Sequence, residues 1–319
     1  KALNVPHLRF PEFTEEWETK PINDLAVVIG GGTPDTTVKS YWDGEIQWFT
    51  PSEIGKTKYV DSSLRTITED GLNNSSAKRL PPNTILLSSR ATIGECSLSL
   101  RECATNQGFQ SLVSKKCNVD FLYYLIQTKK NDLIRKSCGS TFLEISANEV
   151  RKIQVSIPSD VEQQKIAGLL SLIDERIATQ NKIIDKLQSL IKGLRNEIFW
   201  KLRKNVGFNA MIGDVLDYEQ PQSYIVEDTE YIDKGTPVLT ANKAFILGYT
   251  SETEGIYDKG DCIIFDDFTL DSKYVDFPFK VKSSAIKILS AENKELLRYT
   301  FEFLKYLDLS TSEHKRHYI

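Results

Sequence analysis

The pattern of apolar positions is most regular between residues 159 and 204. Apolar residues recur there in alternating steps of four and three, interrupted only by Gln180: Ile166, Leu170, Ile173, Ile177, Gln180, Ile184, Leu187, Ile191, Leu194 and Ile198. This a/d repeat predicts one helix over residues 159–203, of the coiled-coil type, with a seam that needs a partner helix. Pro158 and the segment Ser159-Asp-Val-Glu162 are typical of a helix start, because Ser and Glu side chains can bond free backbone N–H groups. At about 1.5 Å per residue the helix is roughly 65 Å long, which is too long to be buried in one small domain.

The two segments that flank this helix have short apolar runs separated by turn residues. Examples in the first segment are Ile85-Leu86-Leu87 and Ser111-Leu112-Val113, with turn signals at Gly30-Gly-Gly-Thr-Pro34. Helical spacing of apolar residues predicts a helix over Asp120–Arg135. We therefore expect an α/β protein with a globular domain at 1–157, a spacer helix at 158–204 and a second globular domain at 205–319.

The second segment repeats the order of the first with diverged residues, which predicts an internal duplication. Four pairs of short segments correspond: Ile22–Leu25 with Ile212–Val215, Trp48–Ser52 with Val238–Asn242, Asn83–Leu87 with Asp261–Phe265, and Asp120–Tyr124 with Glu295–Tyr299. The second copy ends at Ile319, where we expect a matching long helix to follow. The chain begins with Lys1 and not with Met, so we also expect residues before it.

Composition and charge narrow the function classes. The net charge is −4, and it is uneven: residues 205–319 carry 12 Lys and Arg against 20 Asp and Glu, a net charge of −8. Charge-driven, nonspecific binding to nucleic acid should therefore be weak. The five cysteines are odd in number and scattered, which predicts neither a disulfide framework nor a metal site and suits a reducing cytoplasm. No apolar run approaches the ~20 residues of a membrane span, so we expect no membrane partner.

Motifs for catalysis are missing from the sequence. We find no glycine-rich loop with an Asn/Asp-Pro-Pro-aromatic turn for adenine methylation, and the glycines at 30–32 are not followed by the Gly-Lys-Ser/Thr of a phosphate-binding loop. The alternative function is a Mg²⁺-dependent DNA endonuclease built from Asp266, Asp271 and Lys273. We favour the simpler interpretation, an acidic solvated loop after a buried strand. The three histidines lie at the chain ends and form no constellation for zinc binding or catalysis.

Motifs around the helix start resemble those of the DNA-specificity subunit of type I restriction–modification systems. The strongest is Ile157-Pro-Ser-Asp-Val-Glu-Gln-Gln-Lys-Ile-Ala167, followed by Leu170-Ser-Leu-Ile-Asp-Glu-Arg-Ile177. Further similar motifs precede it: Gly31-Gly-Thr-Pro34, Tyr41-Trp42, Trp48-Phe-Thr-Pro-Ser52, Ser88-Ser-Arg-Ala-Thr-Ile-Gly94 and Asn106-Gln-Gly-Phe109. The resemblance covers residues 13–204 and, more loosely, residues 206–319, where the last two motifs are absent.

The resemblance implies a fold, partners and a lack of catalysis. It implies two target-recognition domains of mixed α/β structure that each recognise half of a split double-stranded DNA site, held apart by long antiparallel helices. It also implies two methyltransferase subunits and restriction/translocase subunits as partners, which would carry S-adenosylmethionine, ATP and Mg²⁺. We expect no cofactor on this chain and a cytoplasmic location. A coiled-coil adaptor that does not bind DNA is the remaining alternative.

Base recognition needs Arg or Lys for guanine, Asn or Gln for adenine, and small hydroxyl groups, on loops that a scaffold holds. In the first domain seven candidates follow the predicted strands at Trp48-Phe49 and Ile85–Leu87: Thr50, Ser52, Lys56, Lys58, Ser89, Arg90 and Thr92. Further candidates are Asn106, Gln107 and Ser140. Two alternatives remain open. Asn106-Gln107-Gly108 could be a turn that satisfies its own backbone, and Arg90 could pair with Glu95 or Asp43.

In the second domain the candidates occupy equivalent positions or are isolated basic residues in an acidic background: Thr240, Asn242, Lys243, Lys273, Lys280, Lys282, Lys315 and Arg316. Each lysine could equally be a solvated surface residue. For the methyltransferase subunits the candidates are the helix-start residues and an outer helix face: Glu162, Gln163, Lys165, Leu169, Arg176, Ile183 and Leu190. Gly168 and Gly193 each cost about 1 kcal/mol of helix propensity relative to Ala, which favours close approach of another subunit there.

Overall fold

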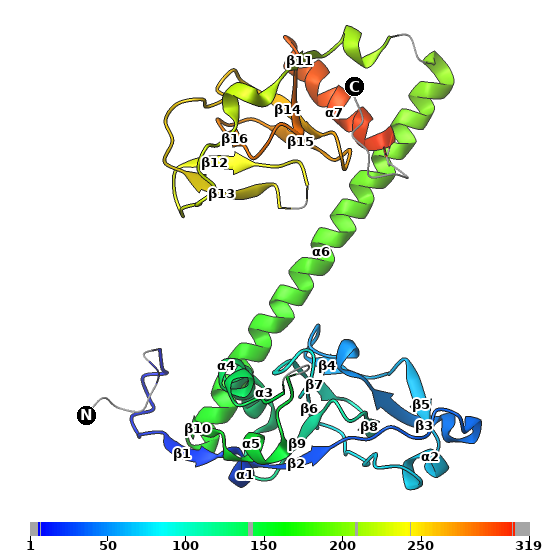
Figure 1. Cartoon of the computed structure of the whole chain (residues 1–319), viewed down its shortest axis with the longest axis vertical. Coiled ribbons are helices and arrows are strands. Elements are labelled where there is room, and N and C mark those ends of the chain that lie inside the picture. The colour runs from blue at the N-terminus through cyan, green and yellow to red at the C-terminus, as the bar shows by residue number, and fades with distance from the viewer. Residues whose placement is uncertain are drawn as a thin grey trace. The chain divides into compact units, whose positions relative to one another are not determined.

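The computed structural model describes residues 6, 8–139, 143–207, 210–242, 244–307 and 309. The chain divides into two compact units, unit 1 (Lys1–Gln180) and unit 2 (Asn181–Ile319). One helix of 47 residues, α6 (Asp160–Val206), contributes to both (Figure 1). The predicted α/β fold with a single long helix is confirmed, and α6 begins one residue after Ser159. No helix in the described ranges combines the length and apolar character needed to cross a membrane.

Unit 1 is built on three sheets in its described residues. The largest has the strand order β2-β9-β6-β7-β4, a second has the order β5-β3-β8, and β1 pairs with β10. The strands are β1 (Glu18–Pro21), β2 (Ala26–Gly30), β3 (Trp42–Phe49), β4 (Tyr59–Val60), β5 (Arg65–Ile67), β6 (Ile85–Leu87), β7 (Cys96–Ser99), β8 (Cys103–Thr105), β9 (Gln110–Ser114) and β10 (Gln154–Ile157). The runs Ile85–Leu87 and Ser111–Val113 are therefore strands, as predicted.

Short helices pack against the sheets of unit 1. They are α1 (Ile22–Leu25), α2 (Glu69–Asn73), α3 (Val119–Gln127), α4 (Lys130–Arg135) and α5 (Ala147–Lys152), with 3-10 turns η1 (Lys39–Tyr41) and η2 (Pro51–Glu53). Helices α1, α3, α4 and α5 contribute to the main core of the unit, whereas α2 packs on the small sheet. The core joins sheet residues such as Ile85 and Leu112 to Leu122 of α3 and Ala167 of α6. Because apolar groups from all three elements leave water together, the start of α6 is part of this domain.

The helix predicted over Asp120–Arg135 is two helices, α3 and α4. At Thr128 both the backbone N–H and the side-chain hydroxyl bond to the carbonyl of Leu125, and Lys129 N–H bonds to Ile126. These three-residue bonds replace the four-residue ladder of an α-helix and end α3. The break is compatible with the apolar pattern because Leu122 and Leu133, one on each helix, are both fully buried.

In its described residues unit 2 has two sheets and one further α-helix besides the C-terminal part of α6. The sheet orders are β11-β17-β14-β15 and β13-β12-β16. The elements are η3 (Ile212–Asp214), β11 (Asp217–Glu219), η4 (Pro221–Tyr224), β12 (Thr236–Leu239), β13 (Ile246–Thr250), β14 (Cys262–Asp266), β15 (Ser272–Val275), β16 (Lys280–Val281), β17 (Ile286–Ser290) and α7 (Lys294–Leu307). Helix α7 packs on the four-stranded sheet through Leu297 and Leu304, which contact Ile263 and Phe265 in one core.

The two units share one topology, which supports the predicted duplication. In each large sheet the strand order matches, β2-β9-β6-β7 in unit 1 and β11-β17-β14-β15 in unit 2. In each small sheet the central strand has one antiparallel and one parallel neighbour, β5 and β8 around β3, and β13 and β16 around β12. The four predicted pairs of segments fall on equivalent elements: α1 with η3, β3 with β12, β6 with β14, and α3 with α7.

The a/d seam of α6 faces solvent over most of its length. In unit 1 Ile173 and Ile177 are 46% and 54% exposed, and in unit 2 five seam residues are about half exposed: Ile184, Leu187, Ile191, Leu194 and Ile198. The described residues of this chain therefore do not supply the predicted partner helix, which stays a prediction. Within the described residues, a Cβ at Gly168 or Gly193 would have no neighbour within 4 Å outside its own stretch of helix, so the close approach expected there is not made by this part of the chain.

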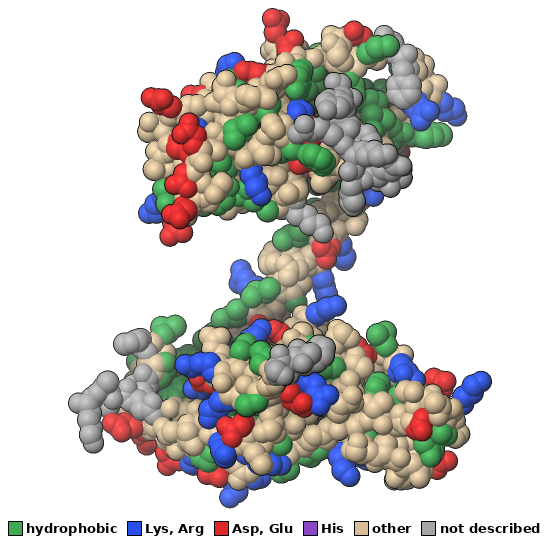
Figure 2. All heavy atoms as spheres, in the orientation of Figure 1, with side chains coloured by type: hydrophobic (Ala, Val, Ile, Leu, Met, Phe, Trp, Pro, Cys, Tyr) green, Lys and Arg blue, Asp and Glu red, His purple; other side chains and the backbone are tan. Residues whose placement is uncertain are grey.

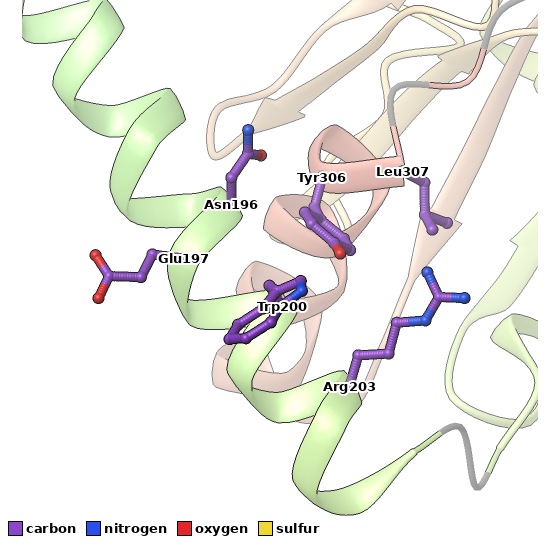
Figure 3. Close-up of a pocket in the computed structure, with 6 residues that line it drawn as sticks. All are labelled: Asn196, Glu197, Trp200, Arg203, Tyr306 and Leu307. Atoms are coloured by element: carbon purple, nitrogen blue, oxygen red, sulfur yellow. The ribbon is translucent and has the colours of Figure 1, made fainter.

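In unit 2, α7 is fixed to α6 by an aromatic cluster. Phe199 of α6 is 6% exposed, and its ring lies 5.3–5.4 Å from those of Tyr299, Phe303 and Tyr306. Arg195 Nε donates to Glu302 at 2.6 Å beside this cluster. Next to it lies an open cavity of about 480 Å³, in which Trp200 and Tyr306 are prominent (Figure 3).

We predict that Phe199→Ala will detach α7 from α6 without unfolding unit 1. Removing a buried phenylalanine side chain costs about 3 kcal/mol or more, because the contacts are lost and a cavity remains. Hydrogen exchange of α7 amides should accelerate accordingly, while exchange in β6 and β9 stays unchanged. Trp200→Ala is the matched control, since Trp200 is 57% exposed and should change α7 exchange by less than about 1 kcal/mol. Equal effects of the two variants would contradict the role assigned to Phe199.

Candidate nucleic-acid interface

The candidate residues of unit 1 gather where the parallel strands β3 and β8 end. Phe49 pairs with Thr105 in parallel register, and Asn106 N–H donates to the Phe49 carbonyl at 3.0 Å. Parallel strands end at the same edge of a sheet, so the loops that begin at Thr50 and Asn106 start side by side. Segments separated by more than fifty residues are thus brought together, as recognition by loops on a rigid scaffold requires.

The loop after β3 is held by one carboxylate. Glu53 Oε2 accepts hydrogen bonds from Thr50 N–H and from the Thr50 hydroxyl, both at 2.7 Å, which caps η2. The hydroxyls of Thr50 and Ser52 lie 3.1 Å apart, and Ser52 is exposed. Thr50 therefore shapes the loop, whereas Ser52 faces outward. The role of Glu53 was not predicted, although Thr50-Pro-Ser-Glu53 has the spacing of a capping box.

The loop after β8 is a turn that satisfies its own backbone, which was one of the two interpretations left open. Gly108 N–H donates to Asn106 Oδ1 at 2.8 Å. This bond uses one acceptor position of the Asn106 amide oxygen, and the NH₂ group of Asn106 remains as a donor. Gln107 is exposed, and its Oε1 accepts from the Thr33 hydroxyl at 2.5 Å. Gln107 is the better candidate for contact with a base.

The glycine-rich segment before Thr33 lies against the same edge. A Cβ on Gly31 would come within 2.1 Å of the Asn106 carbonyl oxygen and 2.4 Å of the Thr105 carbonyl oxygen. Gly32 N–H donates to Thr105 at 2.8 Å. A side chain cannot fit between these backbones, which explains the glycine at position 31. The segment predicted as a turn is irregular backbone that follows β2, and it packs closely against the loop cluster.

The third loop, residues 88–92, joins this cluster through its backbone. Ser89 N–H donates to the Gly108 carbonyl at 2.8 Å, and Ser89 is fully buried. Arg90 pairs with Glu144 at 2.8 Å and is 42% exposed, so neither Glu95 nor Asp43 is its partner. Thr92 is exposed and donates to the Ser88 hydroxyl at 3.1 Å. Arg90 and Thr92 can meet DNA in this conformation, whereas the buried Ser89 cannot.

Lys56 and Lys58 have different environments although they are two residues apart. Lys56 is exposed beside the η2 loop. Lys58 has an 8% exposed side chain, and its ammonium donates to Asp120 and to Ser171 of α6, both at 2.7 Å. Burial lowers the pKa of Lys58, but hydrogen bonds to Asp120 and Tyr124 outweigh it and the pKa is raised. Lys58 fastens α6 to unit 1, so the prediction of a DNA contact there does not agree with its burial.

The equivalent edge of unit 2 has the same backbone frame and different side chains. Leu239 pairs with Val281 in parallel, and Lys282 N–H donates to the Leu239 carbonyl at 3.1 Å, so Lys282 occupies the position of Asn106. Thr240 is 3% exposed and unsuited to contact a base. Asn242 is exposed and starts a turn in which its Oδ1 accepts from Ala244 N–H at 3.2 Å.

The remaining basic candidates of unit 2 divide into three groups. Lys280 is buried and bonds to Glu252 Oε2 and the Glu254 carbonyl, both at 2.7 Å, so its predicted phosphate contact is contradicted by its burial. Lys273 on β15 is half-buried, and Lys282 is exposed. Figure 2 shows acidic side chains over the part of unit 2 that carries β12 and β13. Four candidates lie outside the described residues: Ser140, Lys243, Lys315 and Arg316.

The acidic loop after β14 does not form the arrangement that a Mg²⁺-dependent nuclease needs. Asp266 Oδ1 accepts from Phe268 N–H and Thr269 N–H at 2.9 and 3.0 Å, so its carboxylate closes a turn. Asp267 is 1% exposed and lies 3.3 Å from the Lys287 ammonium, so this loop is not simply solvated as we expected. Among the described residues no group of three His, Cys, Asp or Glu is placed to hold a metal ion.

Two of the residues predicted to bind a methyltransferase are buried inside unit 1. Glu162 is 1% exposed, and both of its carboxylate oxygens accept from the Arg9 guanidinium at 2.7 Å. Gln163 is 2% exposed and accepts from Asn118 N–H at 3.0 Å while donating to the Pro158 carbonyl at 3.0 Å. The motif at the helix start therefore anchors α6 in its own domain, and the predicted partner contact of these two residues is wrong for this conformation.

The other five residues of this set are exposed on α6. Lys165 pairs with Glu12, and its ammonium lies 4.6 Å from the centre of the Phe10 ring. Arg176 is exposed, and Leu169, Ile183 and Leu190 are 46%, 44% and 57% exposed. An exposed stripe of leucine and isoleucine along a helix indicates a surface that a partner buries.

Fold and loop geometry together define a class of protein: a duplicated α/β module whose two copies are carried by one long helix and present polar loops at matching sheet edges. Residues 14–189 match the family model described as "Type I restriction modification DNA specificity domain". The chain belongs to this family.

Individual relatives agree with this assignment. The chain is 35% identical over 218 residues to the type I restriction enzyme MjaIX specificity subunit of Methanocaldococcus jannaschii, covering 67% of this chain and 50% of the relative. It is 50% identical over 115 residues to the EcoR124I/EcoR124II specificity subunit of Escherichia coli, covering 34% of this chain and 28% of the relative. The chain thus spans half or less of the length of these relatives.

A solved structure supports the fold. The S subunit of a type I restriction-modification system from M. genitalium superposes with a TM-score of 0.61 at 18% identity, covering 95% of this chain and 80% of that chain. At this identity the likeness concerns the fold alone.

We predict that Cys138 is the reactive cysteine of the described residues and that DNA protects it. Burial raises the pKa of the Cys96, Cys103, Cys117 and Cys262 thiols to about 12, so these four should resist alkylation in the folded chain. Cys138 is exposed, and its backbone pairs with Glu144, the partner of Arg90. A duplex bound at this edge should slow labelling of Cys138 by N-ethylmaleimide several-fold, as measured by mass spectrometry.

Two controls define the outcome of the labelling experiment. Cys138→Ser should abolish fast labelling, which assigns the reactive thiol. A duplex with a scrambled sequence should protect Cys138 much less than the split site methylated in the source genome. Equal labelling rates with and without that site would contradict the placement of DNA at this edge.

Proposed function

We propose that this chain is the sequence-specific part of a type I restriction–modification complex and recognises a bipartite double-stranded DNA site. Unit 1 recognises one half of the site and unit 2 the other. Exposed or partly exposed residues carry the recognition: the loop residues Ser52, Lys56, Arg90, Thr92, Asn106 and Gln107 in unit 1, with Asn242, Lys282 and the half-buried Lys273 of β15 in unit 2. The chain itself performs no catalysis and acts in the cytoplasm.

One observation carries this proposal: the same loop frame occurs twice on one chain. In both units a parallel strand pair ends in two adjacent loops fixed by the same backbone bond, Asn106 to Phe49 and Lys282 to Leu239. The backbone arrangement of the two loops is the same in both units, but the side chains on the loops differ. This is what two independent half-sites require, since base contacts determine specificity while the scaffold only positions them. The family membership supports the same conclusion.

Helix α6 supports the proposed partners. At 100° per residue, its exposed apolar residues from Leu172 to Ile177 cover an arc of roughly 140°, wider than the narrow a/d seam of a two-helix coiled coil. We therefore propose that two partners bury this surface. A second long helix packs on the a/d seam, and a methyltransferase subunit binds the stripe of Leu169, Ile183 and Leu190. S-adenosylmethionine, ATP and Mg²⁺ belong to the methyltransferase and restriction/translocase subunits in this proposal.

Exchange of one domain tests the modular recognition. Replacing residues 14–157 with the recognition domain of another family member should change one half of the methylated motif. The other half and the spacing should stay unaltered, because unit 2 and α6 are unchanged. The motif is measured by sequencing methylated genomic DNA from cells that express the hybrid complex. A hybrid that altered both halves would contradict independent recognition.

Lengthening α6 is the complementary control for this experiment. Insertion of one heptad adds about 10 Å, or about 3 base pairs. It should change the spacing and leave both half-sites intact. If the heptad insertion altered a half-site instead, the helix would be more than a spacer and the proposed division of roles would be wrong.

A pair of aspartates tests the methyltransferase contact. Leu169→Asp/Leu190→Asp places two charges on the apolar stripe, where desolvation of a charge opposes association. Co-purification with the methyltransferase should be lost while circular dichroism and unit 1 hydrogen exchange stay unchanged. Gln164→Asp/Ser189→Asp is the matched control, since both residues are exposed on α6 away from this stripe. Retained co-purification of the leucine double variant would reject this face as the contact.

A further inference from the structure

Leu64 is an exposed apolar residue on a loop whose backbone is firmly held. It lies between β4 and β5 and is 87% exposed. Its N–H donates to Glu53 Oε1 at 2.6 Å, while the other oxygen of the same carboxylate caps the Thr50 loop. One carboxylate therefore fixes the loop of Ser52 and the loop of Leu64 relative to each other.

Both neighbours of Leu64 are also anchored. Ser63 N–H donates to Gln47 Oε1 at 2.7 Å, and the Ser63 hydroxyl accepts from Trp48 N–H at 2.9 Å. The Arg65 guanidinium carbon lies 3.5 Å from the centre of the Trp42 ring. Single apolar residues on a surface are ordinary and need no explanation. A leucine held outward by bonds on three consecutive residues is different, because its side chain is presented at a fixed place beside a polar recognition loop.

The chemistry of DNA limits what such a side chain could contact. Base edges in the grooves are polar except for the C5-methyl group of thymine in the major groove. Phosphates are charged and offer a leucine no apolar partner, and the sugars are the same at every base and carry no sequence information. We propose that Leu64 recognises the C5-methyl group of one thymine in the half-site of unit 1, and that Glu53 is the positioning residue that holds Leu64 beside Ser52. This inference rests on the proposed function and names one specificity-determining contact of it.

The test removes one methyl group at a time from the DNA. Duplexes that contain the split site methylated in the source genome are synthesised with single thymine-to-uracil replacements, and binding by the full-length chain with its methyltransferase subunits is measured. For the wild type, one replacement in the first half-site should weaken binding about four-fold, the factor expected for burying one methyl group. Leu64→Ala should bind the thymine and uracil duplexes equally at that position and keep its discrimination elsewhere.

Leu100→Ala is the matched control. Leu100 is 49% exposed in the same domain, but its N–H is bonded to the Val60 carbonyl and not to Glu53. This variant should keep the four-fold discrimination. Glu53→Gln, in which an NH₂ group replaces one of the accepting oxygens, should reduce it.

Three results would overturn the inference about Leu64. The first is that the half-site of unit 1 contains no thymine. The second is that Leu64→Ala still distinguishes thymine from uracil at every position. The third is that Leu64→Ala no longer assembles with the methyltransferase subunits. Failure of the proposed function gives a different result, since the wild type would then show no preference for any split site over a scrambled duplex.

Discussion

Parallel pairing of two short strands is the constraint on which the candidate site depends. In unit 1 the pair is β3 with β8, and in unit 2 it is β12 with β16. Parallel strands have both of their carboxyl ends at the same edge, so the two loops that follow them start side by side. In each pair a hydrogen bond joins the first residue of one loop to the last residue of the other strand. The loops can then differ in every exposed side chain, because the backbone frame does not use them.

Polar side chains at the start of α6 connect this frame to the long helix. The buried carboxylate of Glu162 is neutralised by Arg9, and the amide of Gln163 bonds to backbone groups on both sides. Lys58 adds a third tie, from a loop that also carries the exposed Lys56, to Ser171. Buried polar groups of this kind are costly unless fully paired, so they favour one orientation of the helix start within unit 1 over others. Apolar packing alone would specify that orientation less strictly.

The sequence predicted the long helix and the mixed α/β class, because both depend on local patterns that one sequence displays. The a/d spacing gave α6 within a few residues, and short apolar runs gave β6 and β9. The sites were harder to predict. Lys58, Lys280 and Ser89 look like surface residues in sequence, but burial is set by long-range packing, such as Lys58 against α3 and α6. Glu162 and Gln163 were assigned to a partner subunit because they belong to a family motif. Such a motif indicates that residues are important, but it does not show which groups they contact.

The way in which the loops are held has an evolutionary consequence. Glu53 and Asn106 use their side chains to bind backbone groups, so the conformations of both loops are insensitive to the identity of the outward residues. Ser52, Lys56 and Gln107 can therefore be exchanged at little thermodynamic cost to the fold. Under the proposed function, single substitutions at these positions would change the DNA sequence that is recognised while leaving the loop frame and the fold intact.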